Sequence, residues 1–138
     1  EAHQLILAFK NSYSDISFII QTHEVKGGDE VKIEDLKVKI YQMKHYAAVG
    51  VNRILHPDPA VGYRFIYKGE SVAISGDTGI CPGLKKLVQG ADLALIDSTL
   101  NKDEETKELL EKLHLSKEKA EEIGKLAKNY ILIHQRYK

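Results

Sequence analysis

The sequence predicts an α/β (α+β) fold built on a mixed β-sheet, and three observations support this prediction. Short apolar runs rich in β-branched residues recur along the chain, which is typical of strands. Tight turns at Glu34–Asp35 and Lys68–Glu70 each separate two such runs, and each therefore predicts an antiparallel hairpin. The segment Val72–Ile96 instead has the pattern strand, helix, strand, and a βαβ unit of this kind places its two strands in parallel.

The composition predicts one soluble globular domain. The chain has 138 residues, enough for a hydrophobic core of its own. Twenty basic and twenty acidic residues cancel, so no overall charge favours nucleic acid or an anionic membrane. No apolar run is long enough to span a bilayer, and no signal-peptide pattern stands at the start. The single Cys81 cannot form an internal disulfide, so we expect a cytoplasmic protein with no membrane partner.

The first half of the chain predicts mainly strands. Residues 2–10 have a partly helical spacing of apolar side chains and predict a short helix, whereas Ile16–Gln21 is β-branched and predicts a strand. Residues 31–33 and 36–43 alternate apolar and polar side chains, which predicts a hairpin with one solvent-facing side. The polar segment Tyr46–Pro59 contains a glycine and two prolines and predicts a loop.

The second half predicts alternating strands and helices. The predicted strands are Val61–Tyr67, Ser71–Ser75, Leu93–Ile96 and Tyr130–Ile133, and the predicted helices are Pro82–Gln89, Asn101–Leu113 and Ser116–Lys128. The run Leu93–Ile96 is apolar throughout, as expected of a strand that is covered on both faces. Ser116 is a favourable N-cap, and small apolar residues follow it at helical spacing.

A carboxylate follows one of these strands, in the segment V-A-I-S-G-D-T-G of residues 72–79. The apolar strand stops at Ser75–Gly76, and Asp77 stands on the turn that follows. Open α/β folds bind their ligands at the carboxyl edge of the sheet, which makes Asp77 a candidate ligand. Taken alone, this stretch favours a helix cap or an Asx-turn as the role of Asp77, because aspartate is common in both.

Two histidines occupy the same kind of position. His45 follows the predicted strand of residues 38–43, and His134 follows the last strand, residues 131–133. If these strands belong to one sheet, both imidazoles and the Asp77 carboxylate converge on one edge. Such a set suits Zn, Fe or Mn. Either histidine by itself would more often be a surface or core residue than a ligand.

Asp97 and His114 form a second candidate pair. Asp97 directly follows the strand Leu93–Ile96, and His114 stands just before the predicted N-cap Ser116. A carboxylate beside a histidine can orient the ring and hold it protonated, as a general acid for a leaving oxygen requires. The alternative is that Asp97 caps a turn and that His114 merely ends a helix.

Taken in order, these motifs resemble the carboxyl-terminal half of a metallo-β-lactamase-fold hydrolase, and the ribonuclease Z-like phosphodiesterases in particular. The resemblance covers roughly Ile16 to Lys138. The motifs that carry it are His45 after a strand, G-Y-R-F, S-G-D-T-G-x-C, A-D-L-A-L-I-D-S-T-L, H-L-S-x-x-x-A-x-x-I-G-x-L-A and L-I-H-Q-R-Y. It implies that the chain is part of a four-layer αββα sandwich, in which a mixed sheet carries helices on one face.

The same resemblance implies roles for the candidate residues. His45 and His134 would bind divalent metal ions, and Asp77 would bridge the two ions. His114 would assist the leaving group with support from Asp97, whose motif reads I-D-S-T where the family has H-E-A-T. The ions would be Zn, with Mn or Fe as alternatives, and a hydroxide held by both ions would attack the phosphorus of a small phosphodiester or an RNA.

One motif of the family, His-x-His-x-Asp-His, is absent from the sequence. It supplies most of the metal ligands and stands upstream of the matched region. We therefore expect residues 1–138 to be the carboxyl-terminal part of a metallo-β-lactamase-fold domain lacking its amino-terminal half, and to be inactive alone. An uncovered sheet face would favour pairing with that half, or with a second copy in a homo-oligomer.

Two other readings of the sequence stay open. The first is a non-catalytic binding or scaffold domain with a degenerate metal site, which the missing motif and the I-D-S-T departure favour. The second is a stand-alone α/β domain with a single metal held by His45, Asp77 and His134, which predicts that metal alone stabilises the chain.

Overall fold

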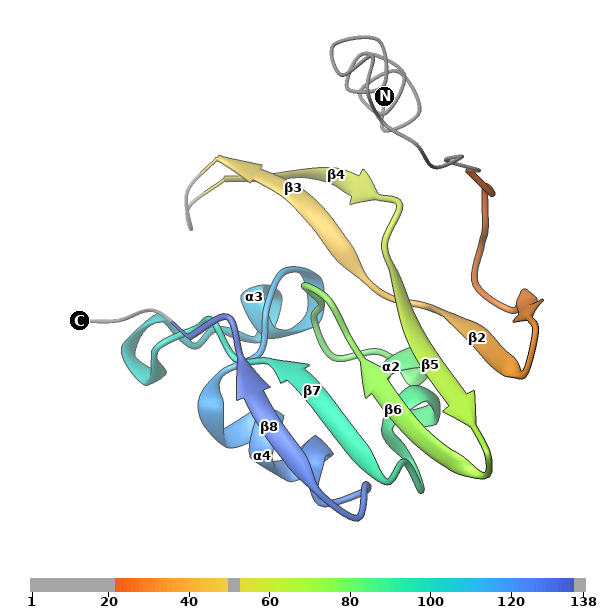
Figure 1. Cartoon of the computed structure of the whole chain (residues 1–138). Coiled ribbons are helices and arrows are strands. Elements are labelled where there is room, and N and C mark those ends of the chain that lie inside the picture. Colours follow the sequence, from red (N-terminus) through yellow and green to blue (C-terminus); the bar gives the residue numbers. More distant parts are fainter. Residues whose placement is uncertain (1–21, 50–52, 136–138) are drawn as a thin grey trace, which may run out of the picture.

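The computed structural model describes residues 22–49 and 53–135, and a six-stranded mixed sheet is the centre of this part (Figure 1). In spatial order the strands are β1 (Glu30–Ile33), β2 (Leu36–Gln42), β5 (Val61–Tyr67), β6 (Glu70–Ile74), β7 (Leu93–Asp97) and β8 (Tyr130–Ile133). Neighbours from β1 to β6 pair antiparallel, and β6, β7 and β8 pair parallel. The predicted fold class is confirmed.

Two short turns produce the antiparallel half of the sheet. Lys68 and Gly69 both have positive φ angles, 49° and 87°, which matches the twist of the β5–β6 hairpin. The β1–β2 hairpin turns at Glu34, whose φ is 51°. Both hairpins agree with the sequence prediction. Gly69 adopts this backbone region without a side-chain penalty, whereas Glu34 and Lys68 adopt it although they carry long side chains.

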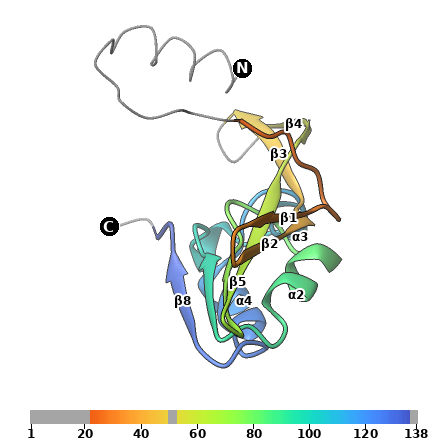
Figure 2. The same ribbon diagram turned by 45° about the vertical axis from the view of Figure 1, so that its right-hand side comes forward.

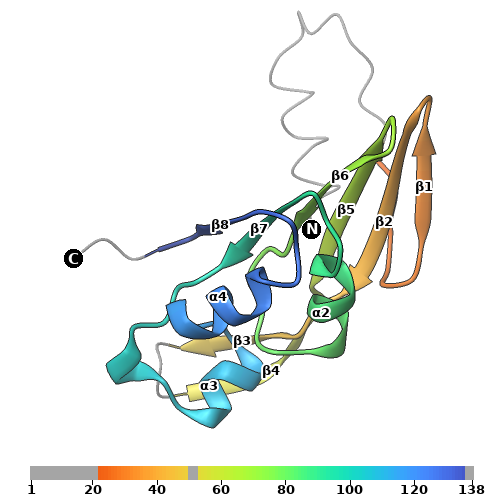
Figure 3. The same cartoon turned by 90° about the horizontal axis from the view of Figure 1, so that it is seen from below.

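Helices α2 (Pro82–Val88) and α4 (Lys117–Gly124) lie on the same face of the sheet (Figure 3). Their inward side chains pack with alternate strand residues into one core. Its fully buried members are Leu84, Leu87, Val88, Ala91, Ala94, Ile96, Leu115 and Ala120. A second, smaller cluster forms around α3 (Lys107–Lys112) at the carboxyl end of the sheet.

No helix among the described residues covers the opposite face of the sheet. Side chains alternate along β6, so that Ala73 points into the core and is 1% exposed, whereas its neighbour Val72 is 36% exposed. Ile33 and Ile131 are 60% and 52% exposed. Register places Val72 in one row with Val38 and Phe65, on the same face. Among residues 22–49 and 53–135, helices therefore cover one face of the sheet, and no helix covers the other, the open apolar face, on which Val38 is nevertheless only 7% exposed.

The prediction of a loop over Tyr46–Pro59 is wrong. The segment forms an antiparallel hairpin of β3 (His45–Val49) and β4 (Arg53–Asp58), which rises from the end of the sheet (Figure 2). Proline is excluded from central strands but is compatible with edge strands, and both strands of a two-stranded ribbon are edges. Pro57 accordingly sits inside β4, opposite Tyr46.

The helices over the last third are shorter than the sequence predicts. Thr106 is the N-cap of α3, because its side chain accepts a hydrogen bond from the Leu109 amide, and the helix therefore starts at Lys107. The 3-10 turn Lys102–Glu104 precedes this cap. Helix α4 ends at Gly124, followed by turns. The predicted helix of residues 2–10 and the strand Ile16–Gln21 lie outside the described residues. Within the part described, no helix has the length and apolarity needed to cross a membrane.

Candidate metal centre

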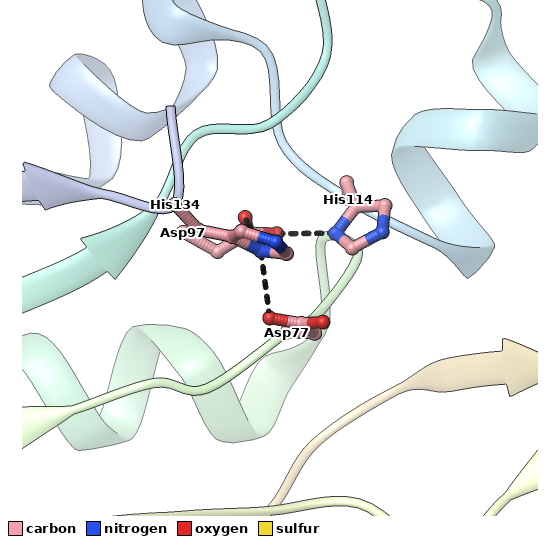
Figure 4. Close-up of side chains that lie close together, drawn as sticks. All are labelled: Asp77, Asp97, His114 and His134. Atoms are coloured by element: carbon pink, nitrogen blue, oxygen red, sulfur yellow. Dashed lines mark hydrogen bonds and ion pairs between the residues drawn. The ribbon is translucent and has the colours of Figure 1, made fainter. Parts of the chain in front are cut away.

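Four candidate side chains meet at the carboxyl edge of the sheet (Figure 4). Asp77 follows β6, Asp97 ends β7, His134 follows β8, and His114 follows α3. One potential ligand atom from each residue lies within 4.8 Å of those of the others. Parallel strands expose their carboxyl ends at one edge, so the order of strands β6–β7–β8 is what collects these residues.

The loop that carries Asp77 is fixed on both sides. The Thr78 hydroxyl accepts a hydrogen bond from the Lys44 amide at 3.3 Å, and the Gly79 amide donates to the Lys44 carbonyl at 2.8 Å. A Cβ on Gly79 would lie 2.6 Å from a backbone carbon of Glu111, so only glycine allows this contact with α3. The backbone is held while the Asp77 carboxyl group remains about half exposed, free to bind a ligand.

The Asp97 side chain is the buried centre of the cluster. Its exposed fraction is 0%, yet both carboxylate oxygens have partners. Oδ2 lies 2.9 Å from His114 Nδ1 and 3.4 Å from the Thr78 amide, and Oδ1 accepts a hydrogen bond from the Thr99 hydroxyl. Its own amide donates to Ser75 Oγ at 3.0 Å. Because a buried carboxylate is costly without partners, this network is what permits Asp97 to sit there.

His134 adopts a backbone conformation that is uncommon for a residue with a side chain. Its φ is 56°, in the left-handed region, and it follows directly on β8. Its Nδ1 lies 2.9 Å from Asp77 Oδ1, 3.0 Å from Thr99 Oγ1 and 3.5 Å from Asp97 Oδ1. A strained backbone that aims a ring at two carboxylates is typical of functional sites.

His45 lies beside this cluster rather than inside it. It is the first residue of β3, with its ring centroid 5.4 Å from that of His114, which in turn lies 5.5 Å from that of His134. The structure thus brings all five predicted site residues to one end of the sheet. Sequence reasoning missed the roles of Thr78 and Thr99, although both stand inside the motifs S-G-D-T-G and I-D-S-T.

The donor set fits a divalent transition metal. Two carboxylates and neutral imidazoles offer oxygen and nitrogen ligands, which suit Zn, Fe or Mn. The two carboxylates also bring negative charge to one point, and a cation would neutralise it. The Asp77 carboxylate and the His134 ring lie 2.9 Å apart and form an ion pair when the ring is protonated (Figure 4).

The model of the beta-lactamase superfamily domain matches residues 2–134. The chain belongs to the beta-lactamase superfamily. Within it, the chain is similar to ribonuclease Z of Methanothermobacter thermautotrophicus (strain Delta H), with 30% identity over 181 residues that cover 100% of the chain and 57% of the relative. A ribonuclease Z of Mycobacterium avium (strain 104) is 44% identical over 45 residues, which cover 33% of the chain and 16% of that protein.

Solved structures of the superfamily share the fold. The metallo-beta-lactamase fold protein YhfI from Bacillus subtilis aligns with a TM-score of 0.67 at 12% identity, over 93% of the chain and 49% of that structure. Human tRNase Z, short form, aligns with a TM-score of 0.58 at 27% identity, over 76% of the chain and 38% of that structure. The chain therefore spans about half or less of the length of these two neighbours.

Proposed function

We propose that the chain is part of a metal-dependent hydrolase that cleaves phosphodiester bonds, in the manner of a ribonuclease Z. The cluster of two carboxylates and two histidines at the carboxyl edge of the sheet is the observation that carries this proposal. Membership of the superfamily and similarity to two proteins named ribonuclease Z support it. The substrate would be a small phosphodiester or an RNA.

The metal ligands in this proposal are His45, Asp77 and His134. The Asp77 carboxylate is about half exposed and lies beside the His134 ring, and in this proposal it would be shared between two ions. The ions would be two divalent cations, Zn or else Mn or Fe, and one relative in fold is described as Zn(2+)-bound PqqB from Methylobacterium extorquens. When bound, such ions activate water and stabilise the negative charge that develops on phosphorus oxygens.

His114 is proposed to deliver a proton to the leaving oxygen. Its Nδ1 is bonded to the Asp97 carboxylate at 2.9 Å, and the carboxylate fixes the ring. The side chain is 17% exposed, so Nε2 is the ring nitrogen left to hold and release a proton. A carboxylate that fixes the ring in this way aims Nε2, the nitrogen from which a general acid would donate.

We further propose that residues 1–138 are the carboxyl-terminal part of a larger metallo-β-lactamase-fold domain. The open apolar face of the sheet supports this, because exposed patches of this kind mark contact surfaces. So does the alignment with relatives of about twice the length. An amino-terminal half packed on that face would complete the sandwich and supply further metal ligands beside His45. Without it, the chain would hydrolyse little or nothing.

The metal site is tested first, on the chain itself. Titration with zinc should raise the unfolding temperature, since a ligand that binds only the folded state stabilises it. Asp77→Ala should abolish that rise, whereas Asp35→Ala, in the exposed β1–β2 turn, should leave it intact. An Asp77→Ala variant that still responds would contradict the assignment of Asp77 as a ligand. A longer protein with the amino-terminal half that ignores zinc would contradict the proposal and favour the scaffold reading.

Catalysis is tested on a longer protein that includes the amino-terminal half. Hydrolysis of bis(4-nitrophenyl) phosphate should require added zinc or manganese and should fall about 100-fold or more in the His114→Ala variant. Cleavage of a precursor tRNA by the same protein would identify RNA as the substrate. Hydrolysis that survives removal of the metal, or that His114→Ala leaves unchanged, would refute the mechanism.

The open face is tested by adding charge to it. The chain alone should self-associate in gel filtration, and Ile131→Lys should reduce this association without lowering the unfolding temperature. Gln89→Lys adds the same charge at an exposed position beside α2 and should have no such effect. If Ile131→Lys changes nothing, the face needs no cover, and the stand-alone domain becomes the better reading.

A further inference from the structure

Thr99 connects the two halves of the candidate site. Its side chain is buried, and Oγ1 reaches both the Asp97 carboxylate and two atoms of His134, the ring Nδ1 at 3.0 Å and the backbone carbonyl at 3.0 Å. The other oxygen of Asp97 holds His114. One hydroxyl group therefore links the proposed proton donor to the proposed metal ligand.

A hydroxyl group has a single hydrogen, and this fixes which of its hydrogen bonds it can donate and which it must accept. Thr99 has one hydrogen to donate, and both the Asp97 carboxylate and the His134 carbonyl can only accept. Whichever of these takes the hydrogen, Oγ1 can only accept a bond from the imidazole. The other neighbours of His134 Nδ1 are the carboxylate oxygens of Asp77 and Asp97, which are acceptors too. Every group around Nδ1 thus requires this nitrogen to carry the proton.

We infer that Thr99 is a positioning residue that holds His134 as its Nδ1–H tautomer and leaves the lone pair on Nε2. This inference rests on the proposed function only in taking His134 to be a metal ligand. The nitrogen that binds a metal is set by the bond that the other nitrogen makes. If Asp77 is itself a ligand, its carboxylate turns to the cation, and Thr99 is the neutral partner that Nδ1 retains.

The same hydroxyl also holds the His134 backbone. Strand β8 ends at Ile133, whose carbonyl accepts a hydrogen bond from the Ser98 amide at 3.0 Å. His134 follows with a φ of 56° and lies outside the regular strand pairing. The Thr99 bond to the His134 carbonyl continues this connection between β7 and β8 by one residue. Ring and backbone of His134 are therefore fixed by one side chain from the neighbouring strand end.

The tautomer can be read from the nitrogen chemical shifts of His134 in a long-range ¹H–¹⁵N spectrum of the metal-free chain. Asp77→Ala removes the competing carboxylate, and His134 should nevertheless remain protonated on Nδ1. Adding Thr99→Val, which keeps the shape and removes the hydroxyl, should convert His134 to a mixture of tautomers. Thr99→Ser should restore the single form. An Nε2–H ring in the Asp77→Ala chain, or one unaffected by Thr99→Val, would overturn the inference.

Zinc affinity gives the second readout, by calorimetry on the chain with Asp77 in place. Thr99→Val should weaken binding about 10- to 100-fold, the usual loss when an outer partner of a ligand is removed, and Thr99→Ser should recover most of it. Ser98→Ala is the matched control, because Ser98 is equally buried and also carries a hydroxyl on the β7–β8 connection. Equal losses in Ser98→Ala and Thr99→Val would reduce Thr99 to a packing residue. Failure of the longer protein with the amino-terminal half to bind zinc would refute the proposed function. The tautomer of His134 in the chain would still decide the role of Thr99.

Discussion

Strand β7 has an aspartate at each end, and the two have opposite surroundings. Asp92, just before the strand, is partly exposed and bonds to the Lys128 ammonium at 2.7 Å and the Ser71 amide at 2.7 Å. Asp97, at the last residue of the strand, is fully buried and bonds to His114 and Thr99. Asp92 is paired with a permanent cation, whereas Asp97 is paired with a histidine and a hydroxyl group.

The partners of each carboxylate explain what it can do. The pKa of Asp92 is lowered to about 2, chiefly by the hydrogen bond from Lys128 and then by those from Ser71. Asp92 therefore stays ionised, and it connects β6 to the segment before β8 through these bonds. Within the part of the chain that the structure describes, no lysine or arginine bonds to Asp97; its carboxylate bonds to the His114 ring, the Thr99 hydroxyl and the Thr78 amide. A carboxylate of this second kind can orient a proton donor, which a saturated surface ion pair cannot.

The largest effect is expected from Asp97→Asn in the longer protein. The amide keeps the shape but offers one acceptor oxygen in place of two, so it cannot hold both His114 and Thr99. Hydrolysis of a phosphodiester should fall about 100-fold or more, and the unfolding temperature should fall as well, because the buried amide donor lacks an acceptor. Asp92→Asn is the matched control and should leave the rate unchanged. Comparable losses of rate in both variants would abolish the distinction between the two ends of the strand.

The second effect concerns Arg64, which fixes the other end of the strand. Its guanidinium donates to the carbonyls of Gln89 at 2.9 Å and Gly90 at 2.8 Å and to Ser71 Oγ at 3.1 Å. Arg64→Met keeps the aliphatic stem and should cost about 1.5–3 kcal/mol in the free energy of unfolding by urea denaturation. Zinc affinity should not change. Weaker zinc binding in Arg64→Met would show that the two ends are coupled.

A smaller effect is expected from Asp92→Asn, and it should depend on pH. The folded pKa of Asp92 is about 2, below its ordinary value of 3.8, so its stabilising contribution is present above about pH 4 and is lost as the pH falls toward about 2. The stability difference between Asp92→Asn and the parent chain should therefore shrink over that range. Lys128→Met should remove much of the same pH dependence, because Lys128 is the main cause of the shift. A difference that is constant with pH would contradict this account.

The smallest effect on stability is expected away from β7, on helix α4. Lys117 and Glu121 lie on the outer side of α4 with nitrogen and oxygen 4.0 Å apart, and both side chains are exposed. Solvent and salt screen such a pair, so Lys117→Met should change the free energy of unfolding by less than about 0.5 kcal/mol. A loss as large as that of Arg64→Met would mean that exposed pairs stabilise this fold more than expected.

Much of the fold followed from local patterns. The strand boundaries Val61–Tyr67 and Tyr130–Ile133 were predicted correctly, because β-branched runs end at turn residues there. The hairpin β3–β4 was not, since the two prolines and the glycine of Tyr46–Pro59 are typical of loops. Pro57 is acceptable inside β4 because both strands of a two-stranded ribbon are edge strands. The ends of α3 and α4 were set by capping and tertiary contacts rather than by helical spacing.

The sequence by itself determined the candidates: His45, Asp77, Asp97 and His134 follow predicted strands, and His114 precedes the N-cap Ser116. Only the tertiary structure decided how they share the site. The order β6–β7–β8 brought four of them within 4.8 Å, left His45 beside them, and placed Thr99 between Asp97 and His134. The physical reason is that strand-end position is a local property, whereas the distance between two strand ends depends on strand order and on long-range packing.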